Sequence, residues 1–237
     1  MKYLLPLILL ITLLPAGSTA QPAGNINYTY KKGSADGIGK WYMGREIAHV
    51  MGAAGATWLE RDERQQEENT ALAIKNMKLK PGAVVADIGA GSGYYTFKIA
   101  PLVPQGKVFA VDIQDEMLQM LSDKKKQLNT ANVTIVKSTD STLNLPDNSI
   151  DLAIMVDVYH ELEYPTEILQ AVYKALKKDG KLLLIEYRGE DASVPIKPLH
   201  KTSIVQMNKE MEANNFKLFY DGEFLPIQHF LEYAKKN

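Results

Sequence analysis

A glycine loop next to an acidic residue is the first part of this sequence that could do chemistry. The segment reads D-I-G-A-G-S-G-Y-Y over residues 87–95 and contains the end of a short apolar run. A strand that turns through glycines into a helix is typical of nucleotide binding at the carboxyl edge of a sheet. Gly89 and Gly91 allow a tight turn and a close approach of backbone to ligand, and Gly93 completes the glycine set.

The spacing of this loop argues against a pyrophosphate-containing cofactor. A dinucleotide fingerprint needs glycine or alanine where this chain has Tyr94, and a phosphate-binding loop needs a Lys-Ser/Thr pair that is missing here. Asp87, two positions before Gly89, would repel a pyrophosphate. A ligand with an ammonium or sulfonium charge suits this carboxylate better.

Two more carboxylates follow the next apolar runs. Asp112 comes near the end of the run 107–113, where a carboxylate can accept hydrogen bonds from both hydroxyls of a ribose. Asp140 follows the run 133–137 and could accept from an adenine amino group while a neighbouring backbone N–H reaches a ring nitrogen. We therefore expect Asp140 and Ser141 to contact the adenine base, with Ile113 as part of the apolar wall around it.

The elements that must position these residues alternate between strand and helix. Beyond Pro81, the predicted strands are 84–88, 107–113, 133–137, 151–156, 181–187, 217–220 and 226–229. The predicted helices are 95–102, 116–128, 165–176 and 201–213. This alternation predicts an α/β, doubly wound, mostly parallel sheet with right-handed crossovers.

The ordered set of residues resembles a known family. The acidic–glycine loop, then Asp112, Asp140 and the segment 145–151, is similar to the class I S-adenosylmethionine-dependent methyltransferases. The resemblance covers about residues 78–190. It implies a seven-stranded Rossmann-like sheet with an antiparallel final strand, and S-adenosylmethionine as cofactor. It also implies Asp87 near the methionine portion, Asp112 on the ribose and Asp140 on the adenine.

In that family, the tip of the fourth strand faces the transferring methyl group. Here it reads Asp157-Val158-Tyr159-His160-Glu161. A general base is needed only if the acceptor must lose a proton, and His160 has a pKa suited to that work. We interpret His160 and Tyr159 as catalytic candidates and Asp157 as a cofactor contact. The set Asp157, His160 and Glu161 could bind a divalent ion, but such loops are common without metal, so we expect none.

The loop after the fifth strand leaves the same edge of the sheet. Arg188, Lys197 and His200 could bind an anionic acceptor, and we group Glu186 with them as candidate substrate residues. The alternative is a solvated connection, and the sequence favours neither.

Composition narrows the class of protein. The chain has 237 residues, a formal net charge of −1 and no cysteine. Disulfides, thiolate metal sites and a cysteine nucleophile are therefore excluded. The near-neutral charge argues against a nucleic-acid surface and favours a small-molecule acceptor.

The N-terminal quarter predicts export and a lid. Residues 1–20 have one Lys, an apolar stretch and small residues before Gln21, which is typical of a cleaved signal peptide for a periplasmic or secreted protein. An uncleaved membrane tether is the alternative, and the mature chain would have no transmembrane span. Residues 21–77 are predicted as a mobile lead-in followed by a helical lid from Trp41. The densely charged stretch 59–69 is interpreted as a solvated helix face, and the alternative is a cover over the site with Arg61 or Arg64 turned inward. Residues 78–237 form the methyltransferase domain.

The function hypothesis is methyl transfer from S-adenosylmethionine to a small molecule. Export would separate such an enzyme from its cytosolic methyl donor. A second hypothesis is therefore a non-catalytic protein that binds an adenosyl ligand on the same scaffold. A nicotinamide-dependent oxidoreductase is disfavoured by Tyr94 and by the lack of an obvious Tyr-x-x-x-Lys pair.

Overall fold

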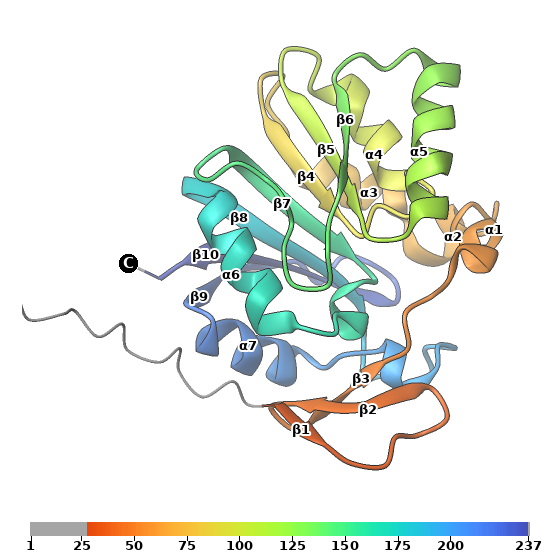
Figure 1. Cartoon of the computed structure of the whole chain (residues 1–237), viewed down its shortest axis with the longest axis vertical. Helices are drawn as coiled ribbons and strands as arrows, with labels where there is room; N and C mark the ends of the chain where they lie inside the picture. Colours follow the sequence, from red (N-terminus) through yellow and green to blue (C-terminus); the bar gives the residue numbers. More distant parts are fainter. Residues whose placement is uncertain (1–27, 237) are drawn as a thin grey trace, which may run out of the picture.

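A twisted, mostly parallel sheet forms the centre of the protein in the computed structural model, which describes residues 28–236 (Figure 1). Within these residues, seven strands have the spatial order β6-β5-β4-β7-β8-β10-β9. β10 pairs antiparallel with both β8 and β9, and β4 to β8 pair in parallel. The strands are β4 (Val84–Ile88), β5 (Lys107–Asp112), β6 (Val133–Lys137), β7 (Ile150–Val156), β8 (Leu176–Tyr187), β9 (Phe216–Asp221) and β10 (Gln228–Lys235).

Helices cover both faces of this sheet. One face packs against α3 (Thr70–Asn76), α4 (Tyr94–Ile99) and α5 (Asp115–Leu128), and its core is the apolar cluster around Phe97, Leu121 and Phe230. The opposite face packs against α6 (Pro165–Ala175) and α7 (Ile204–Ala213), around Leu169, Met207 and Tyr233. Because β4 and β7 lie in the interior of the sheet, their residues are apolar on both faces, as a buried parallel sheet requires.

The predicted α/β fold and seven-stranded sheet are confirmed. The strand order reverses between β4 and β7, because β5 and β6 lie to one side of β4 and the later strands lie to the other. Open α/β sheets bind ligands outside the carboxyl ends of the strands at such a switch point. The glycine loop follows β4, so the topology puts it at this position.

The N-terminal extension differs from the prediction in its first half. Residues 28–48 form a three-stranded antiparallel sheet of β1 (Tyr28–Tyr30), β2 (Gly37–Tyr42) and β3 (Arg45–Ala48). The helix predicted from Trp41 is wrong there, and so is the unstructured lead-in over 28–40. The reason is the Met43-Gly44 turn, with φ of +49° and +102°, because consecutive positive φ values favour a tight hairpin.

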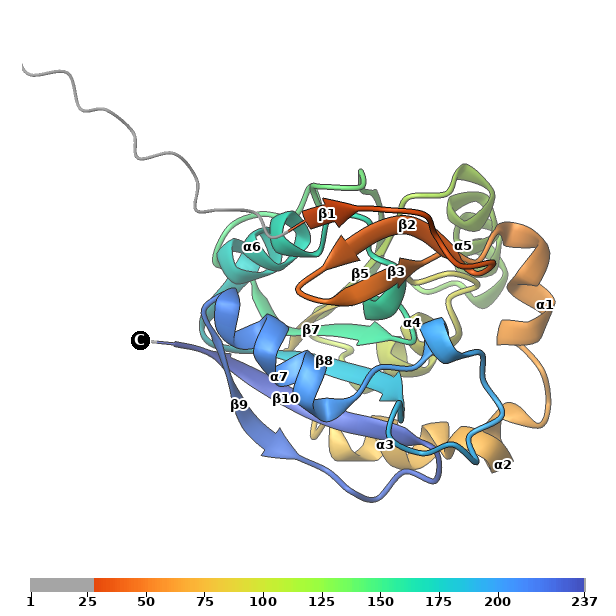
Figure 2. The same cartoon turned by 90° about the horizontal axis from the view of Figure 1, so that it is seen from below.

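Short helices follow this small sheet, as predicted for the lid. They are the 3-10 turn η1 (Ala53–Gly55) and the helices α1 (Ala56–Leu59) and α2 (Arg64–Glu68), which lead into α3. Viewed from below, the small sheet and α1 lie in front of the main sheet, on the side where its parallel strands end (Figure 2). The extension therefore covers the carboxyl edge of the main sheet.

Two N-terminal predictions lie outside the described residues. The signal peptide over 1–20 and the first part of the lead-in are not part of residues 28–236. Across the described part of the chain, no helix has the length and apolar character needed to span a membrane.

Candidate functional site

The glycine loop lies under two other segments of the chain. The backbone N–H groups of Gly89 and Ala90 both donate to the Val111 carbonyl, at 2.9 and 3.0 Å, which fixes the loop to β5. Gly89 has φ +70°, and a Cβ there would lie 2.6 Å from a methyl carbon of Val158. Gly91 has φ +54°, and its Cβ would lie 2.9 Å from Leu59 of the lid. Only glycine tolerates these conformations and approaches without strain.

Asp112 is tied to the same loop. One of its carboxylate oxygens accepts from the Gly91 N–H at 2.8 Å, and the other accepts from Ile113 N–H at 2.8 Å and Gln114 N–H at 3.0 Å. A carboxylate has about four lone-pair positions, so these three bonds leave one for a ligand. The convergence of Asp112 with the glycines is what the sequence predicts.

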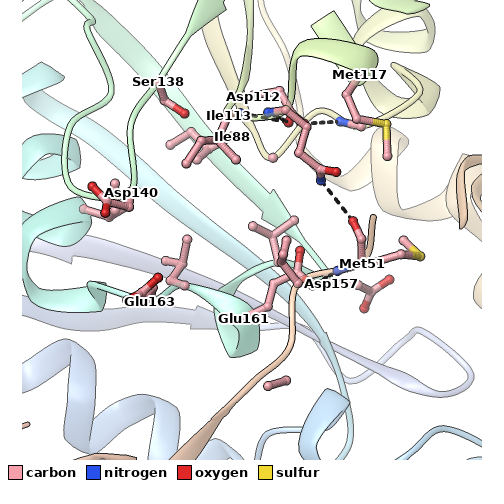
Figure 3. Close-up of a pocket in the computed structure, with 18 of the residues that line it drawn as sticks. Met51, Ile88, Asp112, Ile113, Met117, Ser138, Asp140, Asp157, Glu161 and Glu163 are labelled. Atoms are coloured by element: carbon pink, nitrogen blue, oxygen red, sulfur yellow. Dashed lines mark hydrogen bonds between the residues drawn. The ribbon is translucent and has the colours of Figure 1, made fainter. Parts of the chain in front are cut away.

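These residues line a cavity of about 240 Å³ at the switch point, shown in Figure 3. Its walls contain the predicted residues Gly89, Gly91, Asp112, Ile113, Asp140 and Asp157. Apolar side chains of Ile88, Met117 and Leu143 stand between the carboxylates. Ser141 is outside the lining, and its hydroxyl donates to Asp140 at 3.0 Å. The structure therefore brings most of the predicted cofactor residues to one space.

Asp87 and Gly93 lie behind the loop instead of lining the cavity. The Asp87 carboxylate accepts from the Thr96 hydroxyl at 2.6 Å and is only 3% exposed. Burial raises the pKa of Asp87 to about 6. Gly93 precedes α4, and a Cβ there would clash with Phe97 and Leu121. Its role in the structure is close packing of helix and sheet, so its predicted place in the ligand site is not what the structure shows.

Asp157 connects the cavity with the lid. Its carboxylate accepts from Gln228 Nε2 at 2.9 and 2.8 Å, and the Arg64 guanidinium lies 3.9 Å away. Burial, followed by the nearby carboxylates of Glu68 and Glu186, raises the pKa of Asp157 well above its ordinary value. Arg64 is 3% exposed and also donates to Glu68 at 2.8 Å. The solvated face expected for this stretch is therefore wrong at Arg64, which takes the alternative inward orientation.

The catalytic candidates lie behind the cavity wall. Glu186 accepts from the N–H groups of Val158 at 3.0 Å and Tyr159 at 2.7 Å, and from His160 Nδ1 at 2.7 Å. All of its partners are in the segment after β7, so Glu186 holds this segment in place instead of facing a substrate. Tyr159 is completely buried and its hydroxyl donates to Glu210. The ring of Tyr159 is absent from the lining of the cavity.

His160 is held by the same carboxylate. Burial acts to lower the pKa of His160, but the charge and hydrogen bond of Glu186 outweigh it, so the pKa is raised. Both ring nitrogens already have partners, since Nδ1 faces Glu186 at 2.7 Å and Nε2 faces His200 at 3.2 Å. His160 is 2% exposed and is also outside the cavity lining.

The predicted anion-binding residues do not come together. Arg188 donates to the Pro226 carbonyl at 2.9 Å and pairs with Glu223 at 3.3 Å. Lys197 pairs with Asp36 at 2.6 Å on the surface. His200 lies next to His160 and within electrostatic reach of Lys197 and Asp36, whereas the partners of Arg188 are in the segment before β10. None of the three side chains lines the cavity.

Sequence reasoning missed part of the site. Glu161, noted in the sequence only as a possible metal ligand, lines the cavity and accepts from the Met51 N–H at 3.0 Å. Burial raises the pKa of Glu161 to about 7. Glu163 and the lid residues Met51 and Leu59 also line the cavity. The acidic run after β7 was visible in the sequence, but the contribution of the lid depends on how the extension folds back.

Comparisons with known proteins agree with this geometry. Residues 86–184 match a family model described as a methyltransferase domain. A ubiquinone/menaquinone biosynthesis C-methyltransferase of Pasteurella multocida is 32% identical over 111 residues, which are 46% of this chain and 41% of that protein. The uncharacterized methyltransferase YcgJ of Bacillus subtilis is 30% identical over 134 residues, 55% of this chain and 52% of YcgJ. The chain thus spans about half the length of the curated relatives it matches.

Solved structures extend the likeness over most of the fold. The crystal structure of a SAM-dependent methyltransferase from Aquifex aeolicus has a TM-score of 0.73 and 25% identity, covering 78% of this chain and 98% of that one. The sheet order, the glycine loop at the switch point and Asp112 beside it define an α/β methyltransferase domain. Residues 86–184 are thus similar to the methyltransferase-domain family, and the chain has the Rossmann-like fold of the solved methyltransferases.

Proposed function

We propose that this protein transfers a methyl group from S-adenosylmethionine to a small-molecule acceptor. The observation that carries the proposal is the charge of the cavity. Five of its lining residues are acidic, namely Asp112, Asp140, Asp157, Glu161 and Glu163, and none of the described lining residues is Lys or Arg. Burial raises the pKa of Asp157 and Glu161 and so weakens their share of the charge, but a wall of carboxyl groups without Lys or Arg still suits a cationic ligand better than a pyrophosphate. It therefore favours a sulfonium nucleoside over a nicotinamide dinucleotide.

The arrangement of donors and acceptors fits that cofactor. The remaining lone-pair position of Asp112 suits a ribose hydroxyl, and the Asp140 carboxylate suits an adenine amino group. Ile113 and Leu143 line the cavity as apolar surfaces for the base. Gly91 has no Cβ, so its backbone leaves space beside the loop for the ligand.

S-adenosylmethionine, when bound, supplies an electrophilic methyl carbon whose bond to sulfur breaks as the acceptor's lone pair forms the new bond. The chain's own residues then contribute alignment and exclusion of water. Leu59 of the lid lies over Gly91, and Met51 closes the same side through the hydrogen bond of its N–H to Glu161. Because His160 lies behind the wall with both ring nitrogens in contact with Glu186 and His200, we propose that no residue of this chain needs to act as a general base.

Calorimetry with S-adenosylhomocysteine tests the cofactor. We expect the full-length protein to bind it with one site, and Asp112→Asn to weaken binding by about tenfold or more, because an amide offers fewer acceptor positions. Asp123→Asn, on the exposed side of α5, is the matched control and should bind normally. Absence of binding to the wild-type protein would refute the proposal.

Transfer itself needs a second experiment. Cell extract incubated with the protein and isotopically labelled S-adenosylmethionine should yield a labelled small molecule detectable by mass spectrometry. Binding of the cofactor without any labelled product would instead support the non-catalytic binding protein. Export remains a separate proposal that rests on residues 1–20, and N-terminal sequencing of native material should find Gln21 first.

A further inference from the structure

Three metal-ligating side chains meet behind the cavity wall. His160 and Glu161 belong to the 3-10 turn η3 (Tyr159–Glu161), and His200 belongs to η4 (Pro198–His200), forty positions later in the chain. Each offers one ligand atom, and these atoms all lie within 4.8 Å of one another. The facing nitrogens, His160 Nε2 and His200 Nδ1, are 3.2 Å apart.

The hydrogen bond to Glu186 decides which ring nitrogen of His160 carries a proton. Glu186 accepts two backbone N–H bonds through one oxygen and faces His160 Nδ1 with the other, at 2.7 Å. A carboxylate only accepts, so Nδ1 must be the N–H. In the neutral ring, Nε2 then carries a lone pair, which accepts a hydrogen bond from His200 Nδ1–H in the absence of a metal, so the metal would displace that proton. A histidine whose far nitrogen donates to a carboxylate is the usual arrangement of a metal ligand.

The distances suit a cation held by both rings. With metal–nitrogen bonds of about 2.0–2.1 Å in a tetrahedral site, two ligand nitrogens are about 3.3 Å apart. The observed 3.2 Å is close to that value. The rings meet edge to face, with 73° between their planes, so they are not stacked. Glu161 uses one carboxylate oxygen for the Met51 N–H, which leaves the other oxygen for a metal.

We propose that His160, Glu161 and His200 bind one divalent transition-metal ion of the zinc type. Two imidazoles and one carboxylate with an open fourth position are a common protein ligand set for Zn²⁺. Glu186 is the positioning residue that orients His160. The expectation of no metal from the sequence considered only the loop 157–161, whereas the third ligand here comes from a different loop.

The proposed ion has a defined place relative to the cavity. Glu161 is both a ligand and a lining residue, so the ion lies at the cavity wall below the lid. An ionisable oxygen or sulfur of an acceptor could take the open position and lose its proton more easily there. This last step rests on the proposed methyl transfer, but binding of the metal does not.

The test uses the full-length protein, stripped with a chelator and free of cofactor and acceptor. Titration with Zn²⁺ by calorimetry should show one equivalent bound, and Co²⁺ should give visible absorption bands of a four- or five-coordinate site. His200→Ala should weaken Zn²⁺ binding by about tenfold or more, because it removes one of three ligands. His49→Ala is the matched control for adventitious histidine binding and should leave the affinity unchanged, since His49 is exposed and outside the cluster.

A second measurement keeps the test decisive if His200→Ala does not fold. In the wild-type protein, Zn²⁺ should shift the ring ¹⁵N resonances of His160 and His200 together, while those of His229 stay in place. No binding to the wild-type protein, or equal loss in His49→Ala, would overturn the proposal. So would a protonated His160 that donates to His200 and does not respond to Zn²⁺. None of these outcomes depends on S-adenosylmethionine.

Discussion

The buried carboxyl of Asp87 gives a prediction whose size follows from the structure. Asp87 is 3% exposed, and burial raises its pKa from the ordinary 3.8 to about 6. The folded state therefore favours the neutral acid, and this contribution to stability is present below pH 3.8 and is lost as pH rises to about 6. At about 1.4 kcal/mol per pH unit, ionised Asp87 costs about 3 kcal/mol at pH 8.

The replacement Asp87→Asn should remove this cost. The amide keeps the shape of the side chain and an oxygen that accepts from Thr96. Relative to the wild-type protein, the variant should be stabilised by up to about 3 kcal/mol at pH 8 and by roughly half as much at pH 5. Urea unfolding at both pH values measures the difference, and the exposed Asp123→Asn should show no such dependence on pH.

The same variant separates the stability of the fold from cofactor binding. Calorimetry with S-adenosylhomocysteine should show unchanged binding, because Asp87 lies outside the cavity lining and its carboxylate accepts from Thr96. An equal effect of Asp87→Asn on unfolding at pH 5 and pH 8 would refute the reasoning about burial. Clearly weaker binding would show that Asp87 also acts on the methionine portion of the cofactor.

The remaining predictions concern the lid, the loop and the segment after β7. Arg64→Met should lower the free energy of unfolding by about 1.5–3 kcal/mol in urea titrations, because buried Glu68 loses one of its two arginine partners while Arg61 still pairs with it; a loss below about 1 kcal/mol would contradict this. Gly91→Ala should lower the free energy of unfolding by about 1–2 kcal/mol, because alanine is strained at a φ of +54°. It should also weaken S-adenosylhomocysteine binding in calorimetry, and unchanged binding would exclude close contact between this backbone and the ligand. Tyr159→Phe should lower the free energy of unfolding by about 1–3 kcal/mol, because the hydrogen bond to Glu210 is lost. The rate of methyl transfer per folded molecule should stay unchanged, and a hundredfold slower rate would show that Tyr159 is catalytic after all.

The main sheet was predictable because its pattern is local. Apolar runs such as 84–88 and 133–137 are bounded by loops, and these two strands agree with the prediction. The later strands agree less well, because β8 begins at Leu176 instead of residue 181 and β10 covers Gln228–Lys235 instead of 226–229. The small sheet of the extension was not predictable in this way. Its pairing depends on the Met43-Gly44 turn, and a few apolar residues near Ile47 fit a helix as well as a strand.

The sequence by itself determined which residues end the parallel strands. Since these ends meet at one edge, the glycine loop, Asp112 and Asp140 had to converge there, whatever the details of packing. Only the tertiary structure decided which side of that edge each polar group faces. It turned Asp87 inward to Thr96, turned Arg64 of the lid toward Asp157 and placed His200 against His160. The last two contacts join segments far apart in the chain, and the order of residues does not encode such distances locally.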